Sequence, residues 1–537
     1  MNIRQRLTVY TTRRQSSILS ASIVLAVTFA ISAALGYLRT RFLYGMFFKC
    51  CASELDAYNA AFRLPDLIFK LLVTGALSAS FIPVFSGYLH KDPKQANKIA
   101  STVINLLFLV FIGAAITLLM FTRPLSELIA TGFTSEQFDL MVNLTRILLT
   151  AQIFFLISNF ITAILQVNQI FLIPAFSPIV YNLFIILSIF TLAPRFGLYG
   201  VAYGAVVGAF FHLAIQIPIA RRVGFNYSLV ADTKLKGVRE VVRLMIPRSL
   251  SLGLGEIENT VTLFFSSTLA VGSFSLLNLA MQLIYLPSRI FGTTVGQASL
   301  PILSKNIARN ELNTFRQTVN KTLLQSLFIS LPIATLLLIL RLPVVRIAYG
   351  SRQFPWEATV LTAKTLAFLT PVIVCQAAIQ ILVRSFYALH NTKTPLHIST
   401  ISLLTNIILN YTFIKLTDLG IMGLAISSSV SNIIQVSGLM FLFIKKVDGF
   451  NWLSTFKSAF RIFIASLAAG ASTWMVFKGL DLFLLNTSRT INVLLLLGST
   501  SAIGGSIYLI LAHLLNIEEF AEYKKYFLKT KRFISAK

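Results

Sequence analysis

RSFYALHNTKTPLHISTISLLTNIILNYTFIKLTDLGIMGLA, residues 384–425, joins two apolar stretches through a cationic, hydroxyl-rich turn from His390 to Pro395. Asn406 and Asn410 lie inside the second apolar stretch. Polar groups at bilayer depth are costly unless they face protein or a water-filled path. The segment therefore predicts a membrane protein with a polar interior.

The composition of the whole chain agrees with this interpretation. Mean hydropathy is +0.78, and 56% of the 537 residues are hydrophobic while 12% are charged, which excludes a soluble protein. Apolar runs long enough to cross the hydrocarbon core predict an all-α polytopic protein with about fourteen transmembrane helices. These spans lie near 17–38, 59–88, 98–121, 139–165, 168–192, 197–219, 241–270, 273–303, 318–341, 357–389, 395–416, 420–444, 456–478 and 490–514.

The net charge of +27 comes from cations that gather in alternate loops. The positive-inside rule then places both termini in the cytoplasm, which requires an even number of spans. Anionic lipid of the inner leaflet explains this charge better than nucleic acid does. The cationic groups are Arg4, Arg6, Arg13 and Arg14; Lys91, Lys94 and Lys98; Arg221, Arg222, Lys234, Lys236 and Arg239; Lys305, Arg309 and Arg316; Lys445 and Lys446; and Lys524, Lys525, Lys529, Lys531 and Arg532.

The three cysteines show neither CxxC nor a Cys/His ligand spacing, so the sequence predicts no metal site and no disulfide. We expect Cys50 and Cys51 to be two thiols in the first external loop. The first apolar segment lacks a small-residue cleavage site and runs into further spans, so it is expected to be a retained helix.

A weak internal duplication is visible in the chain. RLPDLIFKLLVTGALSASFIPVFS, residues 63–86, matches YLPSRIFGTTVGQASLPILS, residues 285–304: each has Leu-Pro before a glycine-containing helix and closes with Pro-(Val/Ile)-(Phe/Leu)-Ser. Further along, Gly197-Leu-Tyr-Gly200 matches Gly420-Ile-Met-Gly423. Two matches in the same order predict two parallel repeats of about six helices, a common construction of transporters.

The repeats define the expected domain organisation. The last two spans have no counterpart, and the end of the chain alternates aromatic and cationic residues, which predicts an amphipathic helix on the inner leaflet. The predicted segments are a basic cytoplasmic N-terminus (1–16), an N-lobe (17–222), a basic linker (223–240), a C-lobe (241–446), helices 13 and 14 (447–515) and a basic amphipathic tail (516–537).

Charges within the spans are the main functional candidates. Arg63, Asp66 and Lys70 share one helix face because their spacing is i, i+3, i+7. Beside Arg39 they would form a net-positive wall that attracts phosphate or pyrophosphate. The alternative is that Arg39, Arg41 and Arg63 are helix-end anchors that reach the headgroups.

The second half carries Arg289 and Arg384 as intramembrane cations. Glu258, two positions after Glu256, is a candidate coupling group or a structural ion-pair partner. Asn406 and Asn410 present amide oxygens on one helix face and could hold Na⁺, although hydrogen bonding between helices would explain them as well.

Enzymatic signatures are missing. The five histidines form no HExxH motif and no triad, and no GxxxxGK[ST] motif is present. We therefore predict a secondary transporter that is not an enzyme, has no cofactor or metal, and uses Na⁺ or the membrane potential as its driving force. A membrane scaffold and an intramembrane transferase are the rival classes.

Four segments carry a family resemblance: LGYLRTRFL, the Asp56…Phe62-Arg63-Leu-Pro65 block, YLPSRIFGTTVGQASLPILSK and RSFYALHNTKTP. Together they resemble the MurJ/MviN family, the lipid II flippases of bacterial peptidoglycan synthesis, from about Ser17 to Leu515. The resemblance implies fourteen helices, two pseudo-symmetric lobes, and alternating access that moves the lipid-linked disaccharide-pentapeptide outward. It also implies a multi-pass protein of the bacterial inner membrane.

Position by position, the resemblance implies that Arg39, Asp56 and Arg63 line a cationic cavity for pyrophosphate. Asn406 and Asn410 fall near the place where some members hold sodium. The sequence departs from the family pattern where arginines are common, at Ala33, Phe69 and Gln282; it also has Thr40 and Thr74 where acids are usual. Lys70 and Arg289 are the expected substitutes for the charges missing at Phe69 and Gln282.

The predicted function is therefore flipping of lipid II from the inner to the outer leaflet for cell-wall synthesis. The predicted substrate-binding residues are Arg39, Asp56, Arg63, Lys70, Arg289 and Arg384. The alternatives are a flippase for another polyprenyl-pyrophosphate-linked oligosaccharide, and a MATE-like cation-coupled exporter. The expected partners are lipid II, the membrane and, transiently, the cell-wall synthesis machinery.

Overall fold

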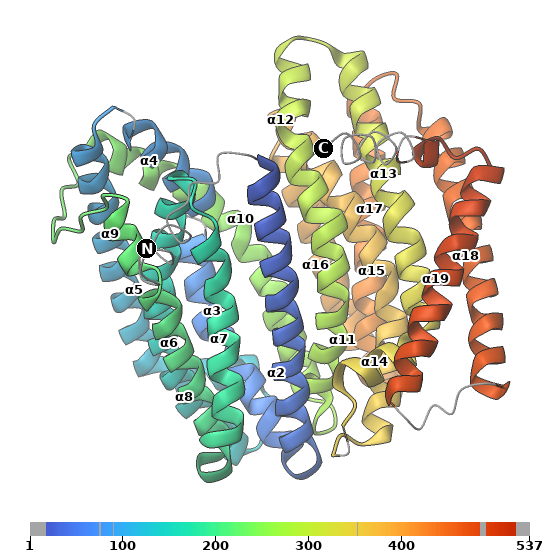
Figure 1. Cartoon of the computed structure of the whole chain (residues 1–537), viewed down its shortest axis with the longest axis horizontal. Helices are drawn as coiled ribbons and strands as arrows, with labels where there is room; N and C mark the ends of the chain where they lie inside the picture. Colours follow the sequence, from blue (N-terminus) through green and yellow to red (C-terminus); the bar gives the residue numbers. More distant parts are fainter. Residues whose placement is uncertain are drawn as a thin grey trace, which may run out of the picture. The chain divides into compact units, whose positions relative to one another are not determined.

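The computed structural model describes residues 18–74, 77–89, 91–351, 353–483, 490–521 and 523. Every regular element within these residues is helical, as the composition predicted (Figure 1). The chain divides into two compact units: unit 1 is Met1–Ser275 with Ser351–Phe354, and unit 2 is Leu276–Gly350 with Pro355–Lys537. The predicted lobe and linker boundaries stay a prediction. The N-terminal segment and nearly all of the predicted tail lie outside the described residues.

Helix α10, which begins within the predicted linker, packs on α5 and on the short elements near residues 70–89, and it belongs to unit 1. The helices of unit 1 are α2 (Ile18–Ala61), α3 (Arg63–Phe69), the π-helices η1 (Lys70–Thr74) and η2 (Leu77–Phe81), α4 (Ile82–Leu89), α5 (Pro93–Ile129), α6 (Ser135–Val167), α7 (Leu172–Thr191), α8 (Ala193–Ala214), α9 (Ile217–Arg222) and α10 (Lys236–Ser267).

Unit 2 begins within α11, and its last two helices, α18 and α19, pack side by side (Figure 1). Its helices are α11 (Ser273–Ser288), the π-helix η3 (Arg289–Thr294), α12 (Val295–Ala308), α13 (Leu312–Ile339), α14 (Arg341–Tyr349), α15 (Trp356–Ala388), α16 (Lys393–Leu416), α17 (Ile421–Lys446), α18 (Trp452–Phe483) and α19 (Thr490–Leu514).

Nine segments in the described part of the chain are long and apolar enough to cross a membrane. They coincide with nine of the predicted spans and comprise α5, α6, α7, α8 with α9, α13, α15, α17, α18 and α19. The expected total of about fourteen is not confirmed by this criterion. Two of the remaining predicted spans, 59–88 and 273–303, are each interrupted by π-helical turns instead of forming one continuous helix.

These interruptions fall within the two matched repeat segments. The first copy contains η1 and η2, and the second contains η3, in each case after the shared Leu-Pro. A π-turn releases carbonyl groups from the α-helical pattern, and in lipid each one needs another partner. Ser249 of α10 donates to the carbonyl of Leu71 in η1, and Ser326 of α13 donates to that of Phe291 in η3. Hydroxyl groups of neighbouring helices thus stabilise both interruptions.

The matched glycines adopt the same conformation in both units. Gly197 has φ 57° and ψ −140°, and Gly420 has φ 54° and ψ −129°, a region that is essentially restricted to glycine. Three residues later, a Cβ at Gly200 would meet the Leu192 backbone at 2.6 Å, and one at Gly423 would meet the Phe413 side chain at 2.8 Å. The repeat therefore extends from sequence to backbone geometry.

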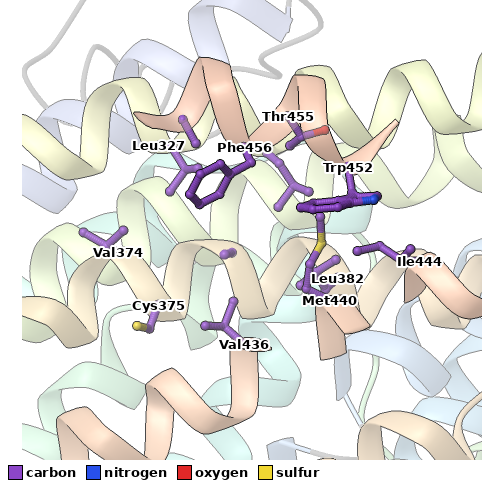
Figure 2. A pocket seen from close by; sticks show the side chains of 13 residues that line it. Leu327, Val374, Cys375, Leu382, Val436, Met440, Ile444, Trp452, Thr455 and Phe456 are labelled. Carbon is purple, nitrogen blue, oxygen red and sulfur yellow. The ribbon is translucent and has the colours of Figure 1, made fainter. Parts of the chain in front are cut away.

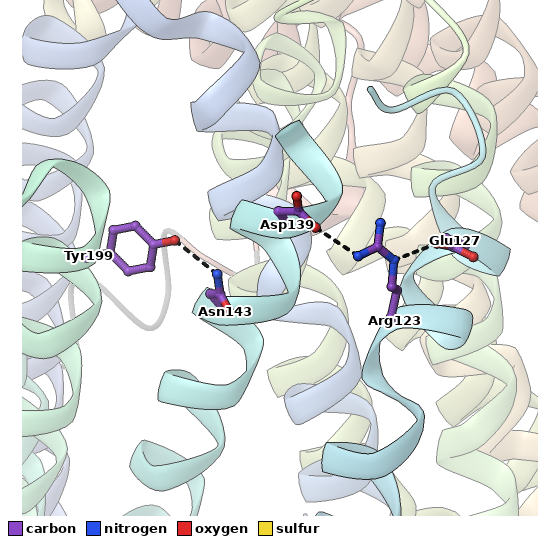
Figure 3. A network of polar contacts seen from close by, with 5 residues as sticks. All are labelled: Arg123, Glu127, Asp139, Asn143 and Tyr199. Atoms are coloured by element: carbon purple, nitrogen blue, oxygen red, sulfur yellow. Dashed lines mark hydrogen bonds and ion pairs between the residues drawn. The ribbon is translucent and has the colours of Figure 1, made fainter. Parts of the chain in front are cut away.

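A polar network fixes the connection between α5 and α6 at one end of unit 1 (Figure 3). Arg123 near the end of α5 contacts Glu127 at 3.1 Å and Asp139 on α6 at 3.0 Å. Thr134 and Gln137 add a capping box at the start of α6. The Arg123–Asp139 contact and the capping box join the end of α5 to the start of α6.

The region around Cys50 corrects one prediction. Cys50 and Cys51 form a disulfide, where the sequence was expected to hold two thiols. Cys51 has φ −144° and ψ 43°, so α2 kinks at the pair. A bond between adjacent residues closes no long loop and has no spacing pattern, which is why cysteine counting missed it.

Candidate functional site

Arg39 lies on α2, half-buried, close enough to the hydroxyl groups of Tyr58 and Tyr181 for electrostatic interaction. Within the described part of the chain its guanidinium group makes no ion pair or hydrogen bond. A cation among apolar helices is costly unless an anion or water compensates it. Arg39 is therefore suited to bind an anion that the described chain does not supply.

The predicted charged face on α3 and η1 has a partner on α10. Lys70 Nζ lies 2.9 Å from Glu256 Oε1, with 40% and 14% of the two side chains exposed. Asp66 interacts electrostatically with Lys70 and with Arg63, so the structure brings these three residues together. The Glu256 carboxylate compensates Lys70, which reduces the positive charge that this face offers to a substrate.

Two further contacts complete the cluster. Asp66 Oδ1 accepts a hydrogen bond of 2.8 Å from Gln152 Nε2 on α6. The Arg63 guanidinium lies over the ring of Phe274, 5.5 Å from its centroid, in a cation–π contact. Nothing in the sequence pattern singled out Gln152 or Phe274, because both come from distant helices.

Asp56 takes part in a different network. Its carboxylate accepts hydrogen bonds from the backbone N–H groups of Gly272, at 2.6 Å, and Ser275, at 2.8 Å. These donors lie at the start of α11, where helical N–H groups have no intrahelical partner. Asn59 Nδ2 joins the network by donating to Tyr44 Oη and Ser275 Oγ. Asp56 is buried and acts as a helix cap in this structure.

The two predicted cations of unit 2 differ in environment. Arg289 is exposed at the first position of η3 and makes no ion pair in the residues that the structure describes. Arg384 is half-buried on α15 and donates to the carbonyl and the side-chain oxygen of Gln380. A Cβ at Gly296 would collide with the Arg384 guanidinium, so the glycine makes room for this side chain on α12.

The candidate coupling residues are all buried or half-buried. Asn410 Nδ2 donates to Asn406 Oδ1 at 2.9 Å on α16, and each residue is 2% exposed. Asn410 Oδ1 and Asn406 Nδ2 remain without a hydrogen-bond partner in the described structure. Glu258 on α10 is half-buried and makes no ion pair within the described residues.

The positions that depart from the family pattern make neutral contacts. Phe69 packs against Phe155 with ring centroids 6.4 Å apart. Gln282 accepts a hydrogen bond of 3.3 Å from the Tyr349 hydroxyl. Ala33 is half-buried on α2. Uncharged contacts thus occupy these positions.

Unit 2 contains an apolar pocket of about 290 Å³ (Figure 2). Trp452 and Phe456 of α18 lie on one side, opposite side chains of α15 and α17 that include Leu382 and Met440. The free thiol of Cys375 also lines it. Such walls offer dispersion contacts to a hydrocarbon chain and no charged group to a polar ligand.

Comparison with known proteins places this arrangement in a family. The family model "Lipid II flippase MurJ" matches residues 51–492. A Bdellovibrio bacteriovorus protein, "Probable lipid II flippase MurJ", is 26% identical over 95% of this chain and 97% of its own length. "Lipid II flippase MurJ" of Burkholderia cenocepacia is 26% identical over 73% of this chain and 77% of its own.

Solved structures agree with this comparison. "Lipid II flippase MurJ, inward closed conformation" superposes with a TM-score of 0.73 at 26% identity, covering 90% of this chain and 98% of that one. An inward-facing multidrug resistance MATE transporter of the MOP superfamily shares the fold, with a TM-score of 0.61 at 14% identity over 78% of this chain and 98% of that one. The chain is a multi-pass membrane protein that belongs to the lipid II flippase MurJ family.

Proposed function

We propose that this protein flips lipid II from the inner to the outer leaflet of the bacterial cytoplasmic membrane. Its family match extends over most of the chain, and relatives that align over nearly their whole length carry that name. Lipid II combines a pyrophosphate, which cannot cross hydrocarbon unaided, with a lipid chain that remains in the bilayer. The protein must therefore shield the anionic group while it crosses.

Arg39 is the observation in the site that best supports this function. It is half-buried and has no anionic partner within the described chain, whereas Lys70 already pairs with Glu256. We assign Arg39 and Arg63 as pyrophosphate anchors, since guanidinium groups bind phosphate oxygens in a bidentate manner. Lys70, Arg289 and Arg384 are proposed as supporting cations. Asp56 holds the start of α11 in place.

Alternating access is the proposed mechanism. The fold is shared with MATE transporters that have been solved in inward-facing and in outward-facing conformations. An exporter of cationic drugs would need an acidic site, so Arg39 and Arg63 favour an anionic substrate over that alternative. The uncharged residues Phe69 and Gln282 favour one second candidate, a flippase for another polyprenyl-pyrophosphate-linked oligosaccharide.

The driving force is proposed to be Na⁺ or the membrane potential. The unpartnered, buried Asn410 Oδ1 is an oxygen ligand of the kind that hard cations prefer. Glu258 is a second candidate coupling group. A charge that moves through the potential contributes about 2.3 kcal/mol per 100 mV.

The loop cations support an orientation with both termini in the cytoplasm. In this orientation the protein would receive its substrate from the enzymes that build lipid II at the inner leaflet. It would release lipid II to the polymerising machinery outside. Transient contacts with that machinery are part of the proposal.

The experiment is depletion of the protein in its native bacterium with complementation by variants. Arg39→Ala is expected to fail to restore growth, while lipid-linked precursors accumulate and are identified by mass spectrometry. Arg41→Ala is the matched control, because it removes the same charge two positions along α2 and should complement. Normal growth and normal precursor levels with Arg39→Ala would refute the anchor role. Accumulation of a different lipid-linked oligosaccharide would favour the second candidate.

A further inference from the structure

The chain that follows α9 is held against α5 by a ladder of polar side chains. We call residues 224–230 the strap. Asn97, Ser101 and Asn105 occupy every fourth position of α5 and therefore lie on one helix face. The ladder consists of Asn97 Nδ2 to Gly224 O at 2.8 Å, Ser228 N to Ser101 Oγ at 3.1 Å, Asn105 Nδ2 to Ser228 O and to Val230 O at 3.0 Å each, and the Tyr227 hydroxyl to Asn105 Oδ1.

A second network fixes the neighbouring helices. Ser158 Oγ on α6 lies 2.7 Å from His212 Nδ1 on α8 and accepts a hydrogen bond from Gln216 Nε2. Thr162 Oγ1 donates to Gln216 Oε1 at 2.8 Å. Ser158, His212 and Gln216 are buried, and such fully satisfied networks hold helices in one arrangement. The position of α9 relative to α6 is thereby set.

Between these two networks lies a pocket of about 310 Å³ within unit 1. This volume is within the range of small-molecule sites. Its inner walls are apolar, and Asn105, Arg221 and Tyr227 provide polar groups among the lining residues. The apolar lining residues are Ile104, Phe108, Ile157, Ile161, Ile217, Ala220 and Phe225.

The charge around this pocket is strongly positive and unbalanced. Arg221 is exposed and makes no ion pair in the described part of the chain. Of the acids in the same segments, Asp92 caps α5 and Asp232 pairs with Lys98 at 2.9 Å. The third, Glu240, is exposed on α10 and does not line the pocket. The hydrogen bond from Lys98 lowers the pKa of Asp232 and so keeps this carboxylate charged beside its partner. The further cations of these segments are Lys91, Lys94, Arg222, Lys234, Lys236 and Arg239.

We propose that this pocket binds one anionic phospholipid, with its phosphate at Arg221 and one acyl chain between α5 and α6. The apolar walls exclude a purely polar anion, and the unpaired guanidinium disfavours a neutral hydrocarbon. A phospholipid satisfies both, and Tyr227, an exposed residue among the lining, is of the type that membrane proteins use at the headgroup level. That this phospholipid comes from the cytoplasmic leaflet rests on the proposed orientation of the protein. Binding of the phospholipid does not depend on lipid II transport.

The test is native mass spectrometry of the purified full-length protein with added phosphatidylglycerol or phosphatidylcholine of the same acyl chains. One phosphatidylglycerol should remain bound under conditions that remove phosphatidylcholine. Arg221→Gln should weaken this binding by roughly tenfold or more, because it removes a charge-assisted hydrogen bond. Arg222→Gln is the matched control: it removes the same charge from the adjacent residue, which does not line the pocket, and should retain binding.

A second variant tests the acyl-chain part of the site. Ile157→Trp fills the pocket without a change of charge and should abolish retention, while thermal unfolding verifies that the variant is folded. Soluble sn-glycerol 3-phosphate should fail to displace the lipid. Four outcomes would each overturn the proposal. They are equal retention of the two lipids, equal losses of binding in Arg221→Gln and Arg222→Gln, displacement of the lipid by the soluble phosphate, and unchanged binding in folded Ile157→Trp. Because lipid II is absent from the measurement, these outcomes are independent of the proposed flipping.

Discussion

The cations of the candidate site differ in how much uncompensated positive charge each offers to a substrate. The sequence counts Arg39, Arg63 and Lys70 as equal cations, but the structure pairs Lys70 with Glu256 and places Arg63 over Phe274. The charge of Arg39 is not compensated by an acidic partner in the described residues. Spacing along a helix predicts which charges share a face, but a partner on a distant helix decides how much charge is left.

The Lys70–Glu256 pair allows a test of whether Lys70 is structural or binds substrate. Lys70→Glu should lower thermal stability, since it places two carboxylates together. The double variant Lys70→Glu with Glu256→Lys restores an ion pair in which the two charges are exchanged, so it should recover thermal stability. We expect growth to remain below the wild-type level even where stability recovers, because the double variant lacks the cation at position 70 that is proposed to support the substrate. Full recovery of growth would instead leave Lys70 with a structural role only.

The readouts are thermal unfolding in detergent and growth of the depletion strain. Recovery of stability without recovery of growth would show that a cation at position 70 itself is needed by the substrate. The single variant Glu256→Lys places two cations together and is the reference for repulsion between positive charges.

Asn410 provides a residue-scale test of ion coupling. If its buried amide oxygen binds Na⁺, the wild-type protein should unfold at a higher temperature in NaCl than in choline chloride, because a ligand that binds only the folded state stabilises it. Asn410→Ala should remove this difference. Thr400→Ala on an exposed position of the same helix is the control and should keep it. A sodium-dependent shift that persists in Asn410→Ala would exclude the site.

At the scale of helices, sequence patterns predicted the straight segments well. Helices such as α6 and α15 contain apolar runs long enough to cross the bilayer, so the length of the run locates them. The π-helices η1 and η3 were not predicted, because a one-residue widening of a helix leaves the apolar pattern unchanged. The disulfide between Cys50 and Cys51 was missed for a similar reason: adjacent cysteines carry no spacing signal.

The matched glycines have two different structural roles, of which close helix packing is only one. Small residues were predicted to let helices approach, which holds for Gly200 and Gly423. Gly197 and Gly420 instead have positive φ, and a Cβ added at either would meet no atom within 4 Å, so backbone conformation is what requires them. The sequence cannot distinguish these two roles, since both appear as glycine in an apolar run.

Gly420→Ala should therefore destabilise the protein by about 1 kcal/mol or more, because the side chain disfavours this backbone conformation. Gly113→Ala, in the middle of α5 with open space and no positive φ, is the control. That substitution should be neutral or stabilising by up to about 1 kcal/mol. Thermal unfolding of the two variants measures the contrast, and equal stability would contradict the assigned role of Gly420.

At the scale of the whole molecule, the sequence predicted an all-α membrane protein of the flippase family, and the comparisons confirm both. Two repeats were predicted, and their matched glycines and π-helices recur in both units. The polar contacts of Asp66 and Asp56 could not be predicted, because their partners Gln152 and Ser275 lie far away along the chain. Family membership and local charge together lead to the function proposed for the molecule.

The most direct test of that function is reconstitution of the purified protein in liposomes that contain lipid II. The measured quantity is the fraction of lipid II that a membrane-impermeant, amine-reactive label added outside can reach. This fraction should rise in liposomes with the protein and stay at the protein-free level with Arg39→Ala. If the wild-type protein leaves the labelled fraction unchanged while it moves another polyprenyl-pyrophosphate-linked oligosaccharide, lipid II is not its substrate.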